Sequence, residues 1–244
     1  MKPLVLAHRG ASAVAPENTL TAFDCAFEMG ADGIELDVTL TKDGIPVVIH
    51  DDNVDRTTNG HGPIKQMTLA EVKTLDAGSW FDTRFRGAQI PTLAQVLEAV
   101  RGHGIVNIEL KSVTLKSDGL EQVVAKVVEQ AGMRDRVIIS SFNPFALNRM
   151  ANCSPRLPRG LLYADNLPIY LRRAWLRPIA HPRALHPKYT MVTPKLVNWA
   201  KSKGYAVNTW TVDDPEEMRR LIGLGVNAIM TNRPDRLKQV LENS

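Results

Sequence analysis

Acidic and basic side chains interrupt two apolar runs at places where each run ends. Glu35 and Asp37 stand two residues apart in one run, and Glu109 and Lys111 stand two residues apart in another. Residues at i and i+2 of a strand point to the same face. Buried carboxylates repel one another unless a cation neutralises them. Three oxygen donors without a nearby cysteine favour a hard ion, Mg²⁺ or Ca²⁺; an ion network with Arg9 and Lys111 is the alternative.

Two histidines also end apolar runs. His8 and Arg9 follow a short run near the start of the chain, and His50 ends another run just before two aspartates. Two cationic groups at the end of a buried strand indicate an anionic ligand at that place. Imidazole is suited to proton transfer near neutral pH. A single histidine at a strand end is usually structural, but two of them beside three acids and two cations indicate catalysis.

The elements that must position these groups alternate along the chain. Helical patterns often start with proline just after a capping residue, as in Asn143-Pro144 and Asp214-Pro215. We predict helices over Thr19–Met29, Thr92–Arg101, Gly119–Ala131, Pro144–Ala151, Pro194–Lys203, Pro215–Gly223 and Pro234–Glu242. We predict strands over Leu4–His8, Gly33–Leu40, Pro46–His50, Val106–Lys111, Val137–Phe142, Arg159–Tyr163, Ala184–His186, Ala206–Val212 and Asn227–Thr231. This alternation favours a parallel sheet covered by helices.

One of these strands does not fit a parallel order. The Gly33–Leu40 and Pro46–His50 strands are joined by five residues, too few for a parallel crossover, so they form a hairpin. Eight parallel strands then remain, which predicts an irregular (β/α)₈ TIM barrel. Residues 51–90 become a small insertion after the hairpin. With no linker or repeat, residues 1–244 are expected to form a single barrel domain.

The hairpin loop decides where His50 lies. A two-residue loop at Asp43-Gly44 places His50 opposite Asp37, and a three-residue loop that includes Lys42 places it opposite Leu36. Both alternatives keep His50 near the end of the strand that carries the paired acids.

Composition excludes several classes of protein. The chain has 244 residues, 44% of them hydrophobic, and a formal net charge of +4. It lacks an apolar run long enough for a membrane span and a recognisable signal peptide, so we expect no stable membrane insertion. Two cysteines without metal-type spacing suit a reducing, cytoplasmic location. Composition leaves the oligomeric state open.

The ordered motifs resemble the glycerophosphodiester phosphodiesterase family, in its cytosolic bacterial form. The resemblance covers nearly the whole chain, and it is carried by the set of motifs rather than by any one of them. The motifs are His8-Arg9-Gly10, Pro16-Glu17-Asn18-Thr19, Glu35-Leu36-Asp37-Val38, Asp43-Gly44, Val48-Ile49-His50-Asp51, Arg56-Thr57-Thr58, Pro91-Thr92-Leu93, Asn107-Ile108-Glu109-Leu110-Lys111, Ser140-Ser141-Phe142, Thr209-Trp210-Thr211-Val212 and Gly225-Val226-Asn227-Ala228-Ile229-Met230-Thr231-Asn232.

The resemblance implies metal-dependent hydrolysis of glycerophosphodiesters to glycerol 3-phosphate and an alcohol. It assigns one divalent metal to Glu35, Asp37 and Glu109, and acid–base catalysis to His8 and His50. We expect His8 to be the base and His50 the acid, although the order is open, and either water or the 2-hydroxyl of the substrate is the nucleophile.

Other residues are expected to bind substrate or brace the site. Arg9 and Lys111 suit the phosphate, because a guanidinium binds two oxygens at once and an ammonium adds a point charge. Trp210 is a candidate wall for the glycerol pocket, with core packing as the alternative. We expect Glu17 and Asn18 to cap the first helix and brace its loop. His186 is expected to be a loop histidine, with reach into the pocket as the alternative.

Each alternative function predicts its own features in the sequence. A phospholipase acting on lysolipid or sphingolipid should show an apolar rim or a secretion signal, and a non-enzymatic barrel that binds phosphorylated ligands should lack a histidine or a carboxylate. Nucleic-acid binding is not expected, because basic residues gather only in Leu167–Tyr189. That basic stretch is expected to be a solvated helix and loop on the barrel exterior, with a patch for acidic lipid or phosphate as the alternative.

Overall fold

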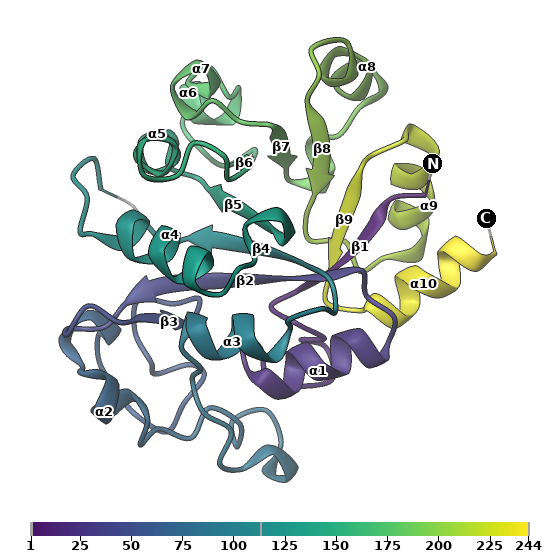
Figure 1. Ribbon diagram of the computed structural model, residues 1–244. Coiled ribbons are helices and arrows are strands. Elements are labelled where there is room, and N and C mark those ends of the chain that lie inside the picture. Colours follow the sequence, from purple (N-terminus) through teal and green to yellow (C-terminus); the bar gives the residue numbers. More distant parts are fainter. Residues whose placement is uncertain (1, 113, 244) are drawn as a thin grey trace.

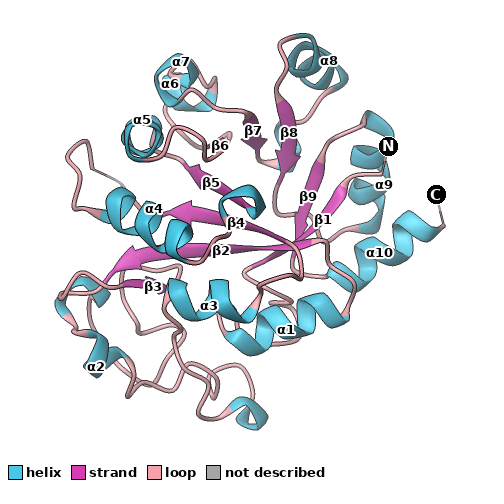
Figure 2. Ribbon diagram, in the orientation of Figure 1, coloured by secondary structure: helices cyan, strands magenta, loops and turns pink. Residues whose placement is uncertain are grey.

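The sheet carries the predicted strands in the predicted order. The computed structural model describes residues 2–112 and 114–243, and the ribbon views show the strands surrounded by helices (Figures 1 and 2). Within these residues the strands are β1 (Leu4–His8), β2 (Gly33–Leu40), β3 (Pro46–Val48), β4 (Ile105–Leu110), β5 (Val137–Ser141), β6 (Arg159–Tyr163), β7 (Ala184–Pro187), β8 (Ala206–Thr209) and β9 (Ala228–Thr231).

Parallel pairing closes the sheet into a barrel. The strand order is β1-β9-β8-β7-β6-β5-β4-β2, and β1 also pairs with β2, so that the eight parallel strands among the described residues form a ring. Every residue of β2 is buried, as expected for a strand with side chains on one face and helices on the other. The predicted TIM barrel is confirmed.

Helices cover the outside of this ring. The α-helices in the described part of the chain are α1 (Leu20–Glu28), α2 (Leu69–Val72), α3 (Leu93–Ala99), α4 (Leu120–Gln130), α5 (Pro144–Cys153), α6 (Ile169–Arg172), α7 (Arg177–Ala180), α8 (Pro194–Ser202), α9 (Pro215–Leu224) and α10 (Pro234–Glu242). Short 3₁₀ turns lie at Ile64–Gln66, Thr83–Phe85, Arg134–Arg136 and Tyr189–Met191. Side chains of Asn143, Thr193 and Asp214 accept hydrogen bonds from the first turns of the helices that follow them, and proline opens each of these helices.

The β2–β3 hairpin has the three-residue loop. Val38 pairs with Val48 and Leu40 with Pro46, and this register leaves Lys42, Asp43 and Gly44 in the turn. Strand β3 ends at Val48, two residues earlier than predicted. His50 therefore is not held opposite Leu36 by sheet pairing. It lies in the loop that leaves β3.

The insertion at residues 51–90 has a small core of its own. Its buried apolar side chains, together with Val47 and Ile49 from β3 and its end, form a cluster separate from the main core. The backbone N–H groups of Gly78, Ser79 and Gly87 also donate hydrogen bonds to the carboxylate of Asp76. This core holds the insertion against the edge of the barrel, beside the chain that carries His50.

The basic stretch Leu167–Tyr189 forms two one-turn helices, α6 and α7, between β6 and β7 (Figure 1). Both helices lie outside the barrel, in agreement with the prediction of an exterior helix and loop. The prediction was wrong for Ala184–Pro187 in the same stretch, because these residues form the buried strand β7. Nowhere among residues 2–112 and 114–243 is there a helix with the length and apolar character needed to cross a bilayer.

Candidate active site

The candidate site lies at the carboxyl ends of β1 and β4 and at the residues of β2 that pair with them. Sheet register places His8 beside Glu35 and Asp37 beside Glu109, because the three strands are parallel and adjacent. One ligand oxygen from each carboxylate lies within 4.8 Å of the others. Active sites of barrels of this class form at the carboxyl ends of the strands. The predicted acids thus meet at one end of the barrel, as the spacing in the sequence indicated.

A cavity of about 190 Å³ opens over these groups. Asp37 does not line it; the residue is 1% exposed and is covered by its contacts with Arg9, Lys111 and Asn18. The cavity is lined by every other predicted site residue, namely His8, Arg9, Glu35, His50, Glu109, Lys111 and Trp210, and also by Asn107, Phe142, Leu162, Thr211 and Met230. The structure therefore brings the predicted residues together, and the role of each stays a prediction.

Two cations lie against the three carboxylates. The Nε atom of Arg9 is 3.4 Å from Asp37, and Nζ of Lys111 is 3.5 Å from Asp37 and 3.0 Å from Glu109. The backbone N–H of Arg9 donates to Glu35. Arg9 has φ of +57°, a left-handed conformation that costs free energy for a residue other than glycine. The chain holds this strained conformation at the place where its N–H meets a buried acid.

These two cations do not neutralise the whole cluster. Burial, and then the charges of Asp37 and Glu109, raise the pKa of Glu35 well above its usual value. Burial and the charge of Asp37 raise the pKa of Glu109 to about 7. The pKa of Asp37 is lowered although burial opposes this, because Lys111 and Arg9 lie beside it. Three acids that do not all ionise on their own have the charge to hold a divalent cation, which would replace the retained protons.

The donor set also suits such an ion. It consists of carboxylate oxygens, the ligands that Mg²⁺ and Ca²⁺ prefer. Asn107, which lies beside Glu35 across the β2–β4 ladder, is 1% exposed, and its Oδ1 has no hydrogen-bond partner in the described part of the chain. Its amide group donates to Ser140 instead. The cavity thus offers one further oxygen acceptor next to the carboxylates.

The position of the proton on His8 is set by the residue that directly follows β9. Its Nδ1 lies 2.7 Å from Oδ1 of Asn232. The Nδ2 of Asn232 donates to Asp213, which fixes the orientation of the amide and leaves Oδ1 as an acceptor. His8 must therefore carry its proton on Nδ1, so that Nε2, 4.0 Å from Glu35, has the free lone pair. Burial and the charge of Arg9 lower the pKa of His8 to about 4, so the ring is neutral at pH 7.

His50 is oriented by a different pair. Its Nδ1 lies 2.5 Å from Asp51, whose carboxylate also accepts from Nε of Arg56. Hydrogen bonds from Arg56 lower the pKa of Asp51 to about 2, so Asp51 accepts and the Nδ1 of His50 donates. Nε2 is then the ring atom of His50 left for proton transfer. Arg56 and Arg9 both donate to Glu17, which links the loop carrying His50 to the loop after β1.

One wall of the cavity is apolar. The ring of Trp210 meets that of Phe142 edge to face, with centroids 5.5 Å apart. The indole N–H donates to the backbone oxygen of His186, which fixes the ring. Leu162 and Met230 continue this wall. Trp210 thus faces the cavity instead of packing wholly in the core, and the wall suits the carbon atoms of a small substrate.

Some expectations for supporting residues were wrong. Thr19, not Asn18 or Glu17, caps α1. Asn18 instead donates to Asp37 from a left-handed conformation, and the proline-flanked motif that contains it was the available signal. His186 is a buried strand residue inside the barrel, bonded to Asn208, and not a loop histidine.

Comparison with known proteins agrees with this geometry. The family model described as "Glycerophosphoryl diester phosphodiesterase family" matches residues 8–236. A glycerophosphodiester phosphodiesterase of Caldanaerobacter subterraneus is 48% identical over 238 residues, which cover 97% of each chain.

Solved structures match as well. A phosphodiesterase from Oleispira antarctica, in complex with the product sn-glycerol-3-phosphate, superposes with a TM-score of 0.88 at 33% identity over 99% of this chain and 97% of that one. A glycerophosphodiester phosphodiesterase from Agrobacterium tumefaciens gives 0.85 at 34% identity over 97% and 99%. The family predicted from the motifs is confirmed: this chain is an enzyme of the glycerophosphoryl diester phosphodiesterase family.

Proposed function

We propose that the chain hydrolyses glycerophosphodiesters to glycerol 3-phosphate and an alcohol, using a divalent cation, Mg²⁺ or Ca²⁺, and two histidines. The observation that carries the proposal is one cavity lined by Glu35 and Glu109, two of the three clustered carboxylates, and by two imidazoles. Neither imidazole has a hydrogen-bond partner for its Nε2 among the described residues. The relative from Oleispira antarctica, solved with glycerol 3-phosphate, supports the product class. We also propose that the barrel and its 51–90 insertion act as one catalytic domain.

Glu35, Asp37 and Glu109 would hold the cation. When bound, it would withdraw charge from the non-bridging oxygens of the phosphodiester. Arg9 and Lys111 border the same cavity and would bind those oxygens, which orients the phosphorus and stabilises the charge that develops on it. Trp210 and Phe142 would pack against the carbon atoms of the glycerol.

The histidines would move the protons. His8 is neutral with its lone pair on Nε2, so it suits the general base that takes the proton of the attacking hydroxyl, whether of water or of the glycerol 2-hydroxyl. His50, held through Nδ1 by Asp51, would carry a second proton on Nε2 and would give it to the leaving alkoxide. If the 2-hydroxyl attacks first, the product of this step would be a cyclic phosphate, which water would then open to glycerol 3-phosphate. Because Asp51 binds Nδ1, only Nε2 of His50 is available to protonate the alkoxide.

Hydrolysis of glycerophosphocholine, followed by enzymatic detection of glycerol 3-phosphate, tests the proposal. We expect activity to stop with EDTA and to return with Mg²⁺ or Ca²⁺. We expect His8→Ala and His50→Ala each to lower kcat by about 100-fold or more. His61→Ala is the matched control, because His61 is an exposed histidine paired only with Asp55. Full activity in EDTA, or in either active-site variant, would contradict the mechanism.

The two cysteines in the described part of the chain, Cys25 and Cys153, are free thiols. This supports our proposal of a reducing, cytoplasmic location. Expression of the chain with a fluorescent tag, followed by cell fractionation, tests it; recovery of the protein outside the cytoplasm contradicts it.

A further inference from the structure

A second cavity lies on the outer side of the barrel wall, opposite the candidate active site. It has a volume of about 430 Å³ and lies between the α6–α7 segment and the start of α8. Leu162 of β6 lines the active-site cavity, and Tyr163, the next residue, lines this one. Successive side chains of a strand point to opposite faces, so the two cavities share strand β6 as a common wall.

Unpaired cations line this outer cavity. Arg172, Arg173, Arg177 and Lys195 contribute to its wall, and no aspartate or glutamate does. Over residues 2–112 and 114–243, none of these four forms an ion pair with a carboxylate. Arg177 instead lies 5.1 Å from the ring centre of Trp199 and donates to the backbone oxygen of Ala174. Four positive charges without a counter-charge create a potential that attracts anions.

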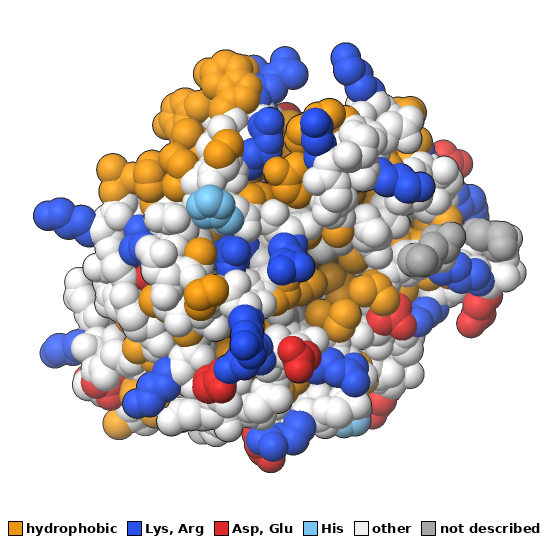
Figure 3. Space-filling view, turned by 45° about the horizontal axis from the view of Figure 1, so that its top comes forward, with side chains coloured by type: hydrophobic (Ala, Val, Ile, Leu, Met, Phe, Trp, Pro, Cys, Tyr) orange, Lys and Arg blue, Asp and Glu red, His pale blue; other side chains and the backbone are white. Residues whose placement is uncertain are grey.

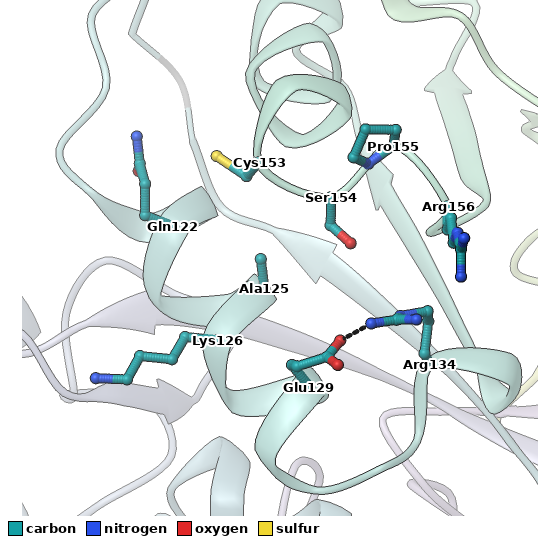
Figure 4. A pocket seen from close by; sticks show the side chains of 9 residues that line it. All are labelled: Gln122, Ala125, Lys126, Glu129, Arg134, Cys153, Ser154, Pro155 and Arg156. Atoms are coloured by element: carbon teal, nitrogen blue, oxygen red, sulfur yellow. Dashed lines mark hydrogen bonds and ion pairs between the residues drawn. The ribbon is translucent and has the colours of Figure 1, made fainter.

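The groove between α4 and α5 is a solvated surface whose charge pattern differs from that of the outer cavity. It is larger, about 700 Å³, and it also holds Lys126, Arg134 and Arg156 (Figure 4). There Glu129 forms an ion pair with Arg134, so that charges of both signs are mixed. Burial raises the pKa of Cys153 in this groove, which disfavours a reactive thiolate. This groove has no charge pattern that selects a ligand.

Large apolar side chains stand beside the outer cations. Ile169, Tyr170 and Trp175 are 43%, 46% and 59% exposed, and they account for half of the large hydrophobic residues that are exposed in the described part of the chain. All three come from the α6–α7 segment that also carries Arg172 and Arg173. In Figure 3 hydrophobic side chains gather at the top of the molecule, over the place of α6 and α7 in Figure 1, with Lys and Arg side chains beside them.

We propose that this surface, formed by Ile169, Tyr170, Arg172, Arg173 and Trp175, binds the anionic phospholipids of a membrane surface. Arginine side chains would contact the lipid phosphates, and the aromatic side chains would enter the headgroup region, where tryptophan and tyrosine are enriched. A free anion would need the cations alone. Binding of a free anion would not explain why Ile169 and Trp175 are exposed to solvent. Binding to a lipid surface would explain the exposed apolar side chains as well as the cations.

The same placement has a consequence for access to the active site. Tyr163 is the last residue of β6, so the outer cavity lies toward the carboxyl ends of the strands, the end of the barrel where the active-site cavity opens. Because the helices α6 and α7 have four residues each, they would contact the membrane surface and would not insert across the bilayer. Membrane binding would hold the site close to lipid-derived phosphodiesters, and it does not depend on the proposed catalytic mechanism.

Sedimentation with lipid vesicles tests the proposal. We expect the protein to bind vesicles of phosphatidylcholine mixed with phosphatidylglycerol at low salt, and not vesicles of phosphatidylcholine alone. We expect Arg172→Glu/Arg173→Glu to weaken this binding by roughly 20-fold or more, because each basic residue near the surface contributes separately. Lys126→Glu/Arg156→Glu, which changes the net charge equally in the α4–α5 groove, is the matched control and should bind almost as the unaltered protein does.

Trp175 provides a second measurement that does not rely on the double variant. Its fluorescence should shift to shorter wavelength with phosphatidylglycerol vesicles, and Trp175→Phe should lose that shift. Circular dichroism and thermal unfolding establish that each variant folds. Equal weakening in the two charge-reversed variants would overturn the proposal, since net charge alone would then explain binding. Binding of inorganic phosphate or of a single-stranded oligonucleotide, without binding of vesicles, would also overturn it.

Discussion

The carboxylate cluster should lower the stability of the metal-free enzyme, so that removing one of its charges makes the protein more stable and less able to bind metal. Glu35→Gln is the sharpest such change. The side chain is 3% exposed, and a glutamine oxygen keeps an acceptor for the N–H of Arg9. The variant therefore removes a charge with little change in shape.

The expected size follows from the geometry. Two full charges separated by 4.8 Å, the limit found in the cluster, repel by about 3.5 kcal/mol at an effective dielectric constant of about 20. Glu35 avoids part of this repulsion by keeping its proton, because burial and the neighbouring acids raise its pKa. Unfolded glutamate loses its proton near pH 4.3, so holding the proton in the folded state costs about 1.4 kcal/mol for each further pH unit.

The sign of the pH dependence is therefore fixed. A carboxyl group whose pKa is raised by folding destabilises the folded state as pH rises above the unfolded pKa. We expect the free energy of unfolding of metal-free Glu35→Gln to exceed that of the unaltered protein by less than about 1 kcal/mol at pH 5. The difference should be larger at pH 7.5, where it can reach at most about 4.5 kcal/mol. For a chain of this length, each kcal/mol of added stability corresponds to a rise in Tm of about 2–4 °C.

Thermal unfolding in EDTA at both pH values, repeated with Mg²⁺ or Ca²⁺, measures these differences. The unaltered protein should gain about 3 kcal/mol when the metal is present at about 100 times its Kd, and Glu35→Gln should lose most of that gain. Glu121→Gln is the control, since Glu121 is buried but paired with Arg149 at 2.7 Å. It should lower stability at both pH values, because it removes the buried carboxylate that pairs with the partly buried Arg149. A lower Tm for metal-free Glu35→Gln at pH 7.5, with the metal effect intact, would refute the reasoning.

Three further predictions concern the surroundings of the cluster. Asn232→Ala should lower kcat about 10-fold or more with little change in KM, because the tautomer of His8 is no longer fixed; steady-state kinetics on glycerophosphocholine measure both constants. Trp210→Ala should mainly raise KM for the same substrate, since it removes a wall of the cavity. Asp76→Asn should lower stability at pH 7 and lose this effect toward pH 2, because the hydrogen bond from Ser79 lowers the pKa of Asp76 and its contribution disappears as the carboxylate takes up a proton; urea unfolding at several pH values tests this.

Most of the barrel was predictable from local patterns in the sequence. The β1, β2 and β6 boundaries agree with the prediction residue for residue, because each is a short apolar run with clear breaks on both sides. The hairpin register was not predictable in the same way, since Asp43-Gly44 fits both loop lengths. Long-range contacts decide it. Lys42 N–H donates to Met67 in the insertion, and Leu69 N–H donates to Asp43.

In the site, too, local sequence patterns predicted some residues, whereas others are identified only by contacts between distant parts of the chain. The three acids were found because charges two residues apart in an apolar run share a face. Asn232, which sets the tautomer of His8, lies 224 residues away from it and in a motif without an unusual spacing. Asn107 was part of a motif, but its unsatisfied oxygen is visible only from packing. Sequence patterns therefore locate the charged groups, and the closed barrel determines which neutral groups orient them.

The charge balance of the cavity links these residues to the proposed reaction. Three carboxylates and the two cations Arg9 and Lys111 leave one net negative charge when every acid is ionised and both histidines are neutral. A divalent cation would change this to one net positive charge, which a phosphodiester with its single negative charge would neutralise. Glycerol 3-phosphate carries more negative charge than the diester, so the same site would then be left with excess negative charge. On this reasoning Arg9 and Lys111 do more than stabilise the empty site, because without them a cation would leave the cavity negative and the substrate anion would be repelled.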